Sequence, residues 1–211
     1  MAYFSESDID NLNHIYKINL INSCSGYKSA NLIGSVSEDG IENVAVFSSV
    51  THIGSSPAML GFFLRPTTVI RNTYENLKAT GVYTINHIHE GIKKDAHHTS
   101  AKYDSAVSEF EVTNLEAEYK PGFKAPFVKD APIQLAMRFV EEYPIKANNT
   151  ILVIGKIVGL YVENELIEDD GFINLSKGNV AVINGLDGYA IPETNTRYGY
   201  QRPKILESEM S

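Results

Sequence analysis

The sequence predicts a mainly β fold, an antiparallel barrel with helices packed at its ends and rim. Segments of strand length with alternating or continuous apolar residues outnumber the helical patterns. Most of these segments are joined by connections of hairpin length. Such connections favour antiparallel pairing over a parallel doubly wound sheet, which needs long crossovers.

Six segments carry the strand pattern. They are residues 31–36, 41–46, 58–64, 81–86, 133–142 and 150–162. The first two flank Ser37-Glu38-Asp39-Gly40, and Asp-Gly is the favoured two-residue hairpin turn. Pro66 ends the third strand, and a polar connection over 143–149 joins the last two.

Helical patterns are fewer and shorter. Helices are expected over residues 5–22, in the segment that ends at Thr80, and in the first part of 90–103, with a short turn over 105–109. The first helix has its N-cap at Ser5, Ser7 or Asp8 and is expected to pack outside the barrel. Gly81 supplies the C-terminal cap of the second.

Length and charge restrict the class of protein. With 211 residues, 43% of them hydrophobic, the chain can bury a sizeable core. We expect the barrel over 25–162, an N-terminal helical extension over 1–24, and a C-terminal extension over 163–211 that packs on the barrel. The net charge of -8 disfavours nucleic-acid and anionic-membrane partners, which are bound through clustered Lys and Arg.

The single cysteine, Cys24, rules out an intramolecular disulfide and a thiolate metal cage. Its apolar surroundings predict a strand and a core-filling role, which suits a reducing compartment. Neither a signal-peptide pattern nor an apolar run long enough to span a membrane occurs. We therefore expect a cytoplasmic protein.

Hydroxyl groups gather in the loop that follows the second strand. The loop is Ser48, Ser49, Val50 and Thr51. At a barrel end, its hydroxyls and free backbone N–H groups could bind the polar edge of an aromatic ring. The alternative is an ordinary turn whose serines bond their own backbone.

Positive charge follows the loop. Arg65 closes the next strand, and Arg71 precedes Asn72, which forms a capping-box pattern with Glu75. The pattern predicts a helix start near Thr73 whose N–H groups attract an anion. The alternative is an ordinary capped helix beside a solvated arginine. Together with the loop, two guanidinium groups and a helix start suit a phosphate-bearing aromatic cofactor such as FMN.

These residues resemble the flavin reductase-like FMN-binding split-barrel family over roughly residues 25–162. The similar segments are Ser25 to Gly34, Glu38-Asp39-Gly40, Asn43 to Val50, Arg71 to Asn76, Thr80-Gly81, Ser108 to Glu111, Ala125 to Val128 and Ala131-Pro132. The resemblance implies a split-barrel homodimer that binds FMN without a covalent link, in a cleft between subunits. It also implies hydride transfer from NADH or NADPH to flavin N5 and electron delivery to free flavin or another small acceptor.

The resemblance also implies which residues hold the cofactor. Ser48, Ser49, Val50 and Thr51 correspond to the loop of the family that contacts the flavin. Arg71, Asn72 and Thr73 correspond to its phosphate-binding residues, with Arg for Lys and Asn for Asp. Arg65 is expected to contact the phosphate or the ribityl chain, and Asn31 to reach the ring edge. No catalytic acid or base is expected, because the cofactor supplies the chemistry.

Other motifs carry alternatives. His52 is either a flavin contact or an ordinary loop histidine, and a metal site at His87, His89, His97 and His98 lacks further ligands. The tail residues Tyr198 and Tyr200 either fold over the cofactor or, as we expect, dock on the barrel.

Three functions stay open: an NAD(P)H-dependent flavin reductase, an FMN-binding electron carrier or module without nucleotide turnover, and an interaction domain with an empty pocket. The acceptor, a partner monooxygenase and the choice between NADH and NADPH are left undecided.

Overall fold

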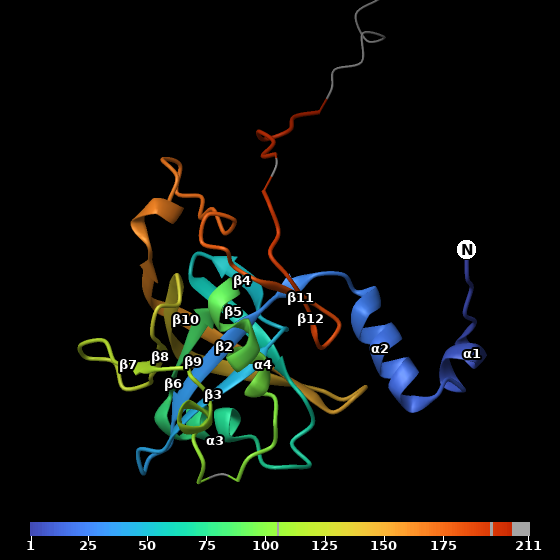
Figure 1. Cartoon of the computed structure of the whole chain (residues 1–211), viewed down its shortest axis with the longest axis horizontal. Helices are drawn as coiled ribbons and strands as arrows, with labels where there is room; N and C mark the ends of the chain where they lie inside the picture. The colour runs from blue at the N-terminus through green and yellow to red at the C-terminus, as the bar shows by residue number, and fades with distance from the viewer. Residues whose placement is uncertain (105, 195, 204–211) are drawn as a thin grey trace, which may run out of the picture.

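The computed structural model describes residues 1–104, 106–194 and 196–203 of the chain. A seven-stranded antiparallel sheet with the order β3-β2-β6-β9-β10-β5-β4 curls into a split barrel (Figure 1). Its strands are β2 (Asn31–Val36), β3 (Glu42–Phe47), β4 (Thr51–Ser55), β5 (Ala58–Leu64), β6 (Val82–His87), β9 (Ile133–Ile145) and β10 (Thr150–Val162). The two edge strands, β3 and β4, are consecutive in the chain. The predicted antiparallel, mainly β architecture is confirmed.

All six predicted strands are present, within a few residues at their ends. The sequence did not reveal β4, because its residues are polar or glycine apart from Ile53 and four of its five are exposed, so they lack the usual alternation. The hairpin between β2 and β3 is correct, but its turn is wider than predicted. Five residues, 37–41, lie between the two strands, and Ser37 N donates to Ile41 O at 2.9 Å.

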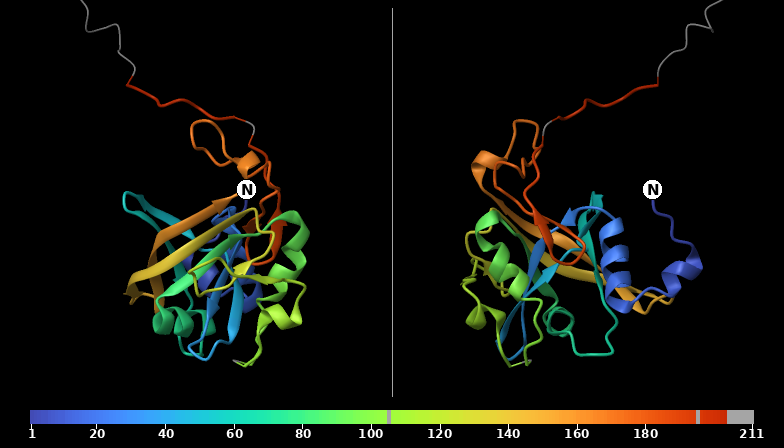
Figure 2. Two further views of the ribbon diagram at one scale, coloured as in Figure 1. Left: turned by 90° about the vertical axis from the view of Figure 1, so that its left-hand side faces the viewer. Right: turned by 45° about the vertical axis from the view of Figure 1, so that its right-hand side comes forward.

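The N-terminal segment differs from the single helix that was predicted. It forms α1 (Glu6–Asp10), capped by Ser5, and α2 (His14–Cys24), capped by Asn13. The asparagines between them favour caps over helix interiors and break the pattern. Both helices stand to one side of the barrel and bury no residue (Figure 2). Cys24 ends α2 and is exposed, so the predicted strand and core-filling role are wrong.

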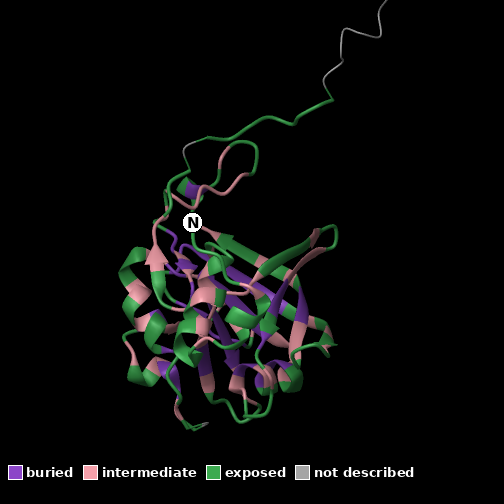
Figure 3. Ribbon diagram, turned by 90° about the vertical axis from the view of Figure 1, so that its right-hand side faces the viewer, coloured by how far each residue is buried: buried purple, intermediate pink, exposed green. Residues whose placement is uncertain are grey.

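Buried residues line the strands and the layer packed against them (Figure 3). One core fills the barrel, with Phe62, Tyr83 and Met137 among its fully buried members. A second core lies on the other side of β2 and β3, under α4 (Lys93–His98) and the segment that includes Leu115 and Val128. The prediction of a helix followed by a loop over 90–103 is confirmed, with η1 (Glu90–Ile92) preceding α4.

Side chains cover the outer edge of β3. Val44 N donates to Glu109 Oε2 at 3.1 Å, and Val46 N donates to Thr99 Oγ1 at 2.9 Å. Glu109 begins α5 (Glu109–Val112), where a short turn was predicted; residue 105, the first of that turn, lies outside the described residues. An edge strand with free N–H groups invites pairing with other chains, and these contacts remove that opportunity.

The C-terminal segment returns to the barrel. Leu166, in η2 (Asn164–Leu166), and Val180 join the barrel core. The smaller strands are β1 (Lys28–Ser29), β11 (Val182–Asn184) and β12 (Gly188–Ala190), which form a three-stranded sheet, and β7 (Ala117–Glu118) and β8 (Phe127–Val128), which form a hairpin. Residues 195 and 204–211 of the predicted C-terminal extension lie outside the described residues. None of the helices in the described part of the chain is long and apolar enough to cross a membrane.

Candidate functional site

The loop between β3 and β4 is held from both sides. The Ser49 hydroxyl accepts a hydrogen bond from Phe63 N and donates one to Phe63 O, each at 3.1 Å. On the other side, Ser29 Oγ donates to Val50 O at 3.1 Å. Sequence reasoning did not assign a role to Ser29 or Phe63, although Ser29 lies two residues before Asn31. These bonds fix the loop without using its own backbone N–H groups.

Those N–H groups form a row of available donors. Within the described residues, the amide N–H groups of Ser48, Ser49 and Val50 donate to no acceptor, and the Ser48 hydroxyl has no partner. Unpaired backbone donors are common only where water or a ligand can take them. The loop can therefore donate several hydrogen bonds to the carbonyl oxygens and ring nitrogens of a flat polar ligand.

Two arginines lie beyond the end of β5. Arg65 follows that strand and is exposed, whereas Arg71 is half-buried at the start of α3 (Asn72–Thr80). Among the described residues, no ion pair includes either arginine. Arg71 Nε is also buried and has no acceptor. A buried donor on an unpaired cation is costly unless an anion accepts from it.

The start of α3 leaves its first donors open. Arg71 is the N-cap residue, in an extended conformation and without a side-chain cap, so the predicted capping box from Asn72 to Glu75 is wrong. Asn72 lies one residue too late in the chain, already within the first turn. Tyr74 N and Glu75 N both donate to Arg71 O, while Asn72 N and Thr73 N donate to no acceptor within the described residues. Two helix N–H groups and Arg71 therefore converge where an anion would be stabilised.

Thr73 faces the barrel rather than solvent. It is 6% exposed, and its Oγ1 accepts a hydrogen bond from Asn43 Nδ2 at 3.0 Å. Its hydroxyl proton remains available, so Thr73 can still donate to an anion at the helix start. Asn43 and Phe47 lie four residues apart on β3, which spans about 13 Å at the usual strand rise. An extended ligand with a ring at the loop and a phosphate at α3 suits this spacing.

Asn31 is less accessible than a direct ring contact requires. It is 1% exposed, and its Nδ2 donates to Ser29 Oγ at 2.9 Å. Its Oδ1 is buried and has no partner in the part of the chain that the structure describes. As the barrel stands, Asn31 touches the loop through Ser29 and does not itself reach the surface.

The histidines of the sequence are dispersed. His52 Nε2 lies 3.2 Å from Ser55 Oγ in β4, and His89 Nδ1 accepts from Gly91 N. His87, opposite Asn31 in the sheet, is half-buried, and burial lowers its pKa to about 4. The described residues contain no group of three or more His, Cys, Asp or Glu that could hold a metal ion.

The tail aromatics do not dock on the barrel as expected. Tyr198 is 86% exposed and Tyr200 is 94% exposed, so neither buries its ring against the rest of the chain. Among the described residues of the tail, Arg197 contacts the rest of the chain: it pairs with Asp170 at 2.7 Å and lies over the Phe172 ring.

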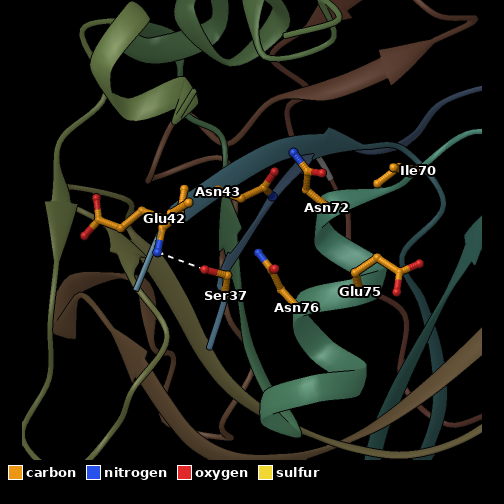
Figure 4. Close-up of a pocket in the computed structure, with 8 residues that line it drawn as sticks. Ser37, Glu42, Asn43, Ile70, Asn72, Glu75 and Asn76 are labelled. Atoms are coloured by element: carbon orange, nitrogen blue, oxygen red, sulfur yellow. Dashed lines mark hydrogen bonds between the residues drawn. The ribbon is translucent and has the colours of Figure 1, made fainter. Parts of the chain in front are cut away.

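A cleft of about 210 Å³ lies beside α3 and the β2–β3 turn (Figure 4). Asn43, Asn72 and Asn76 line it together with two carboxylates, Glu42 and Glu75, and no cation is among its lining residues. The carboxylates would repel a phosphate. An anion would therefore be better stabilised at Arg71 and the open N–H groups than in this cleft.

Comparison with known proteins identifies the family and the fold. A family model described as "Flavin reductase like domain" matches residues 25–178. A crystal structure from Shewanella frigidimarina, of a candidate flavin reductase with a split barrel domain, is 41% identical and superposes with a TM-score of 0.92 over 95% of this chain and 100% of that one.

Two more distant structures share the fold. Nitrilotriacetate monooxygenase component B from Bacillus cereus is 18% identical, with a TM-score of 0.81 over 94% of this chain and 98% of its own. An FMN-binding protein from Thermus thermophilus is 15% identical, with a TM-score of 0.71 over 94% and 99%. At these identities the likeness concerns the fold alone.

Proposed function

The chain belongs to the flavin reductase-like domain family, and we propose that it is an FMN-binding oxidoreductase, an NAD(P)H-dependent flavin reductase that passes electrons to free flavin or another small acceptor. We further propose that it works in the cytoplasm as a homodimer. FMN is bound without a covalent link, with its phosphate at α3 and its ring at the loop between β3 and β4.

The observation that carries this proposal is Arg71. Its buried Nε has no acceptor, its guanidinium has no carboxylate partner among the described residues, and the adjacent N–H groups of Asn72 and Thr73 are open. A dianionic phosphate would accept from all three, and charge-assisted bonds of this kind are about twice as strong as neutral ones. Arg65, exposed just after β5, is the second cation of the proposed site and would contact the phosphate or the ribityl hydroxyls.

The loop residues act on the ring. The N–H groups of Ser48, Ser49 and Val50, with the hydroxyls of Ser48 and Thr51, donate to the polar edge of the isoalloxazine. Ser49 contributes through its backbone N–H, because its hydroxyl is already hydrogen-bonded to the backbone of Phe63. Fixed donors at this edge favour the negative charge that the ring carries after reduction.

When bound, FMN supplies hydride acceptance at N5 and release of electrons to an acceptor. The protein's own part is to hold the ring and phosphate in place and to leave one ring face open for a nicotinamide. The sequence lacks a dinucleotide-binding Gly-rich fingerprint, so the nucleotide would stack against the ring and not occupy a separate Rossmann site.

The visible absorption spectrum of the purified protein tests this proposal. A flavin spectrum that bleaches on anaerobic addition of NADH or NADPH is the expected result. A yellow protein that neither nucleotide bleaches would favour the electron carrier or binding module. If the protein is colourless and added FMN does not raise its melting temperature, the flavin proposal is wrong.

A further inference from the structure

A chain of side-chain hydrogen bonds leads from the loop into the barrel wall. Ser29 Oγ donates to Val50 O, and Asn31 Nδ2 donates to Ser29 Oγ. The Ser29 hydroxyl has one proton, which is used on Val50, so Ser29 can only accept from Asn31. The Asn31 amide is therefore oriented, with its nitrogen toward Ser29 and its oxygen away from it.

That orientation leaves the Asn31 oxygen in need of a donor. Oδ1 is buried and has no partner among the described residues, and Asn31 is 1% exposed, so bulk water does not satisfy it. Two residues flank Asn31 across the sheet, Phe47 on β3 and His87 on β6. Phe47 has no polar side-chain atom. Directly opposed residues of an antiparallel pair have Cβ atoms about 5 Å apart, within reach of an imidazole ring.

His87 has the right chemistry for this role. No hydrogen bond within the described residues uses its ring, and burial lowers its pKa to about 4, so the ring is neutral at physiological pH. A neutral imidazole carries one N–H donor. A donor and an acceptor, each without another partner in the described chain, thus lie at one register position of β2 and β6.

We propose that His87 is a positioning residue of the FMN site: its ring N–H donates to Asn31 Oδ1, directly or through one ordered water, and so fixes Val50 O through Asn31 and Ser29. The peptide that joins Val50 to Thr51 is planar, so fixing its carbonyl also fixes the backbone on either side of it, which carries the open Val50 N–H and the Thr51 hydroxyl. A loop held in advance loses less entropy when it binds a ligand. The effect on FMN rests on the proposed function; the hydrogen bond itself does not.

Variants that separate the effect of the N–H donor from the effect of side-chain volume test the proposal. FMN binding is measured by titration, with the quenching of flavin fluorescence as the signal. His87→Leu replaces the imidazole by an apolar side chain of similar volume that has no donor. We expect it to weaken FMN binding about three- to tenfold. His87→Gln keeps an N–H donor and should restore most of the affinity. Equal affinities for the Leu variant and the parent, or no recovery with Gln, would overturn the proposal.

A double-mutant cycle tests the route of the effect. Ser29→Ala breaks the same chain closer to the loop, so His87→Leu added to Ser29→Ala should cost little more than Ser29→Ala alone. The two losses multiply only if His87 acts by another route, which would also overturn the proposal.

An experiment without FMN distinguishes failure of this proposal from failure of the proposed function. ¹⁵N NMR of the FMN-free protein should show the His87 ring neutral, with one slowly exchanging N–H that Asn31→Ala makes fast. If the parent binds no FMN, the proposed function fails, and the NMR experiment alone decides whether His87 donates to Asn31. A ring proton that exchanges fast in the parent rules the bond out.

Discussion

The phenolic oxygen of Tyr83 fills the space where a side chain at Gly155 would begin. A Cβ on Gly155 would overlap this oxygen and would lie 2.9 Å from Tyr83 Cζ. The two residues lie on β6 and β10, the strands that flank β9 in the sheet, so the tyrosine ring fits only because the second strand lacks a side chain at this position. Tyr83 is fully buried, its hydroxyl has no partner in the described chain, and burial raises its pKa.

This pair predicts a coupled effect on stability. Gly155→Ala should lower the free energy of unfolding by about 1–3 kcal/mol, because the core is overpacked. Tyr83→Phe removes an unsatisfied hydroxyl and should be neutral or stabilising by about 1 kcal/mol. In urea denaturation, the double variant should lose less stability than the sum of the two single changes. Additive losses would show that the hydroxyl is not what excludes the methyl group.

Ser49 is predicted to matter more for the barrel than for the ligand. Ser49→Ala leaves Phe63 N and O without their partner and should destabilise the protein by about 1–2 kcal/mol, measured by urea denaturation. Ser48→Ala is the matched control, because the Ser48 hydroxyl has no partner among the described residues, and its stability should match that of the parent. A Ser49 variant as stable as the control would contradict this role.

Arg71 is predicted to matter for the ligand and not for the fold. Arg71→Ala should weaken FMN binding about ten- to a hundredfold, since a charge-assisted phosphate contact contributes roughly 1.5–3 kcal/mol. The loss should shrink as salt is raised. Arg138→Ala is the control, because Arg138 is exposed on β9 and also takes part in no ion pair of the described residues. Equal affinities for the two variants would move the phosphate site elsewhere.

Glu109 makes stability depend on pH. It is 7% exposed, and burial raises the pKa of its carboxyl although Val44 N donates to it. The folded protein therefore holds this proton more tightly than the unfolded chain, and stability from this group falls as pH rises through the raised pKa. Glu109→Gln keeps an acceptor for Val44 without the charge, so its gain in melting temperature over the parent should be larger at pH 8 than at pH 4.

Glu109→Ala tests the hydrogen bond to Val44 N at the edge of β3 separately from the charge of the carboxylate. It leaves Val44 N without its partner and should destabilise the protein by about 1–2 kcal/mol at low pH, where the parent carboxyl is protonated. A gain from Glu109→Gln that does not change with pH would show that the carboxyl ionises as freely in the folded protein as in the unfolded chain.

The errors of the sequence-based predictions have specific causes. Asn72 with Glu75 matches a capping box, but the helix starts one residue earlier, because Arg71 takes the extended conformation of the cap. Cys24 has apolar neighbours, yet they belong to a helix that buries none of them. β4 has almost no apolar pattern, because its backbone pairing with β5, and not the burial of its side chains, makes it a strand. Each of these depends on contacts that local pattern does not contain.

The sequence by itself determined the antiparallel strands, the hairpin from β2 to β3, the Gly81 cap and the segments that carry the hydroxyls and arginines. These follow from local periodicity and turn chemistry, which act over a few residues. Only the tertiary structure decided that the Ser49 hydroxyl bonds to Phe63, that Asn31 is buried opposite His87 and that Arg71 Nε lacks an acceptor in the described chain. Pairing and burial join residues far apart in the chain, and so they determine which polar groups are already used and which remain open for a ligand.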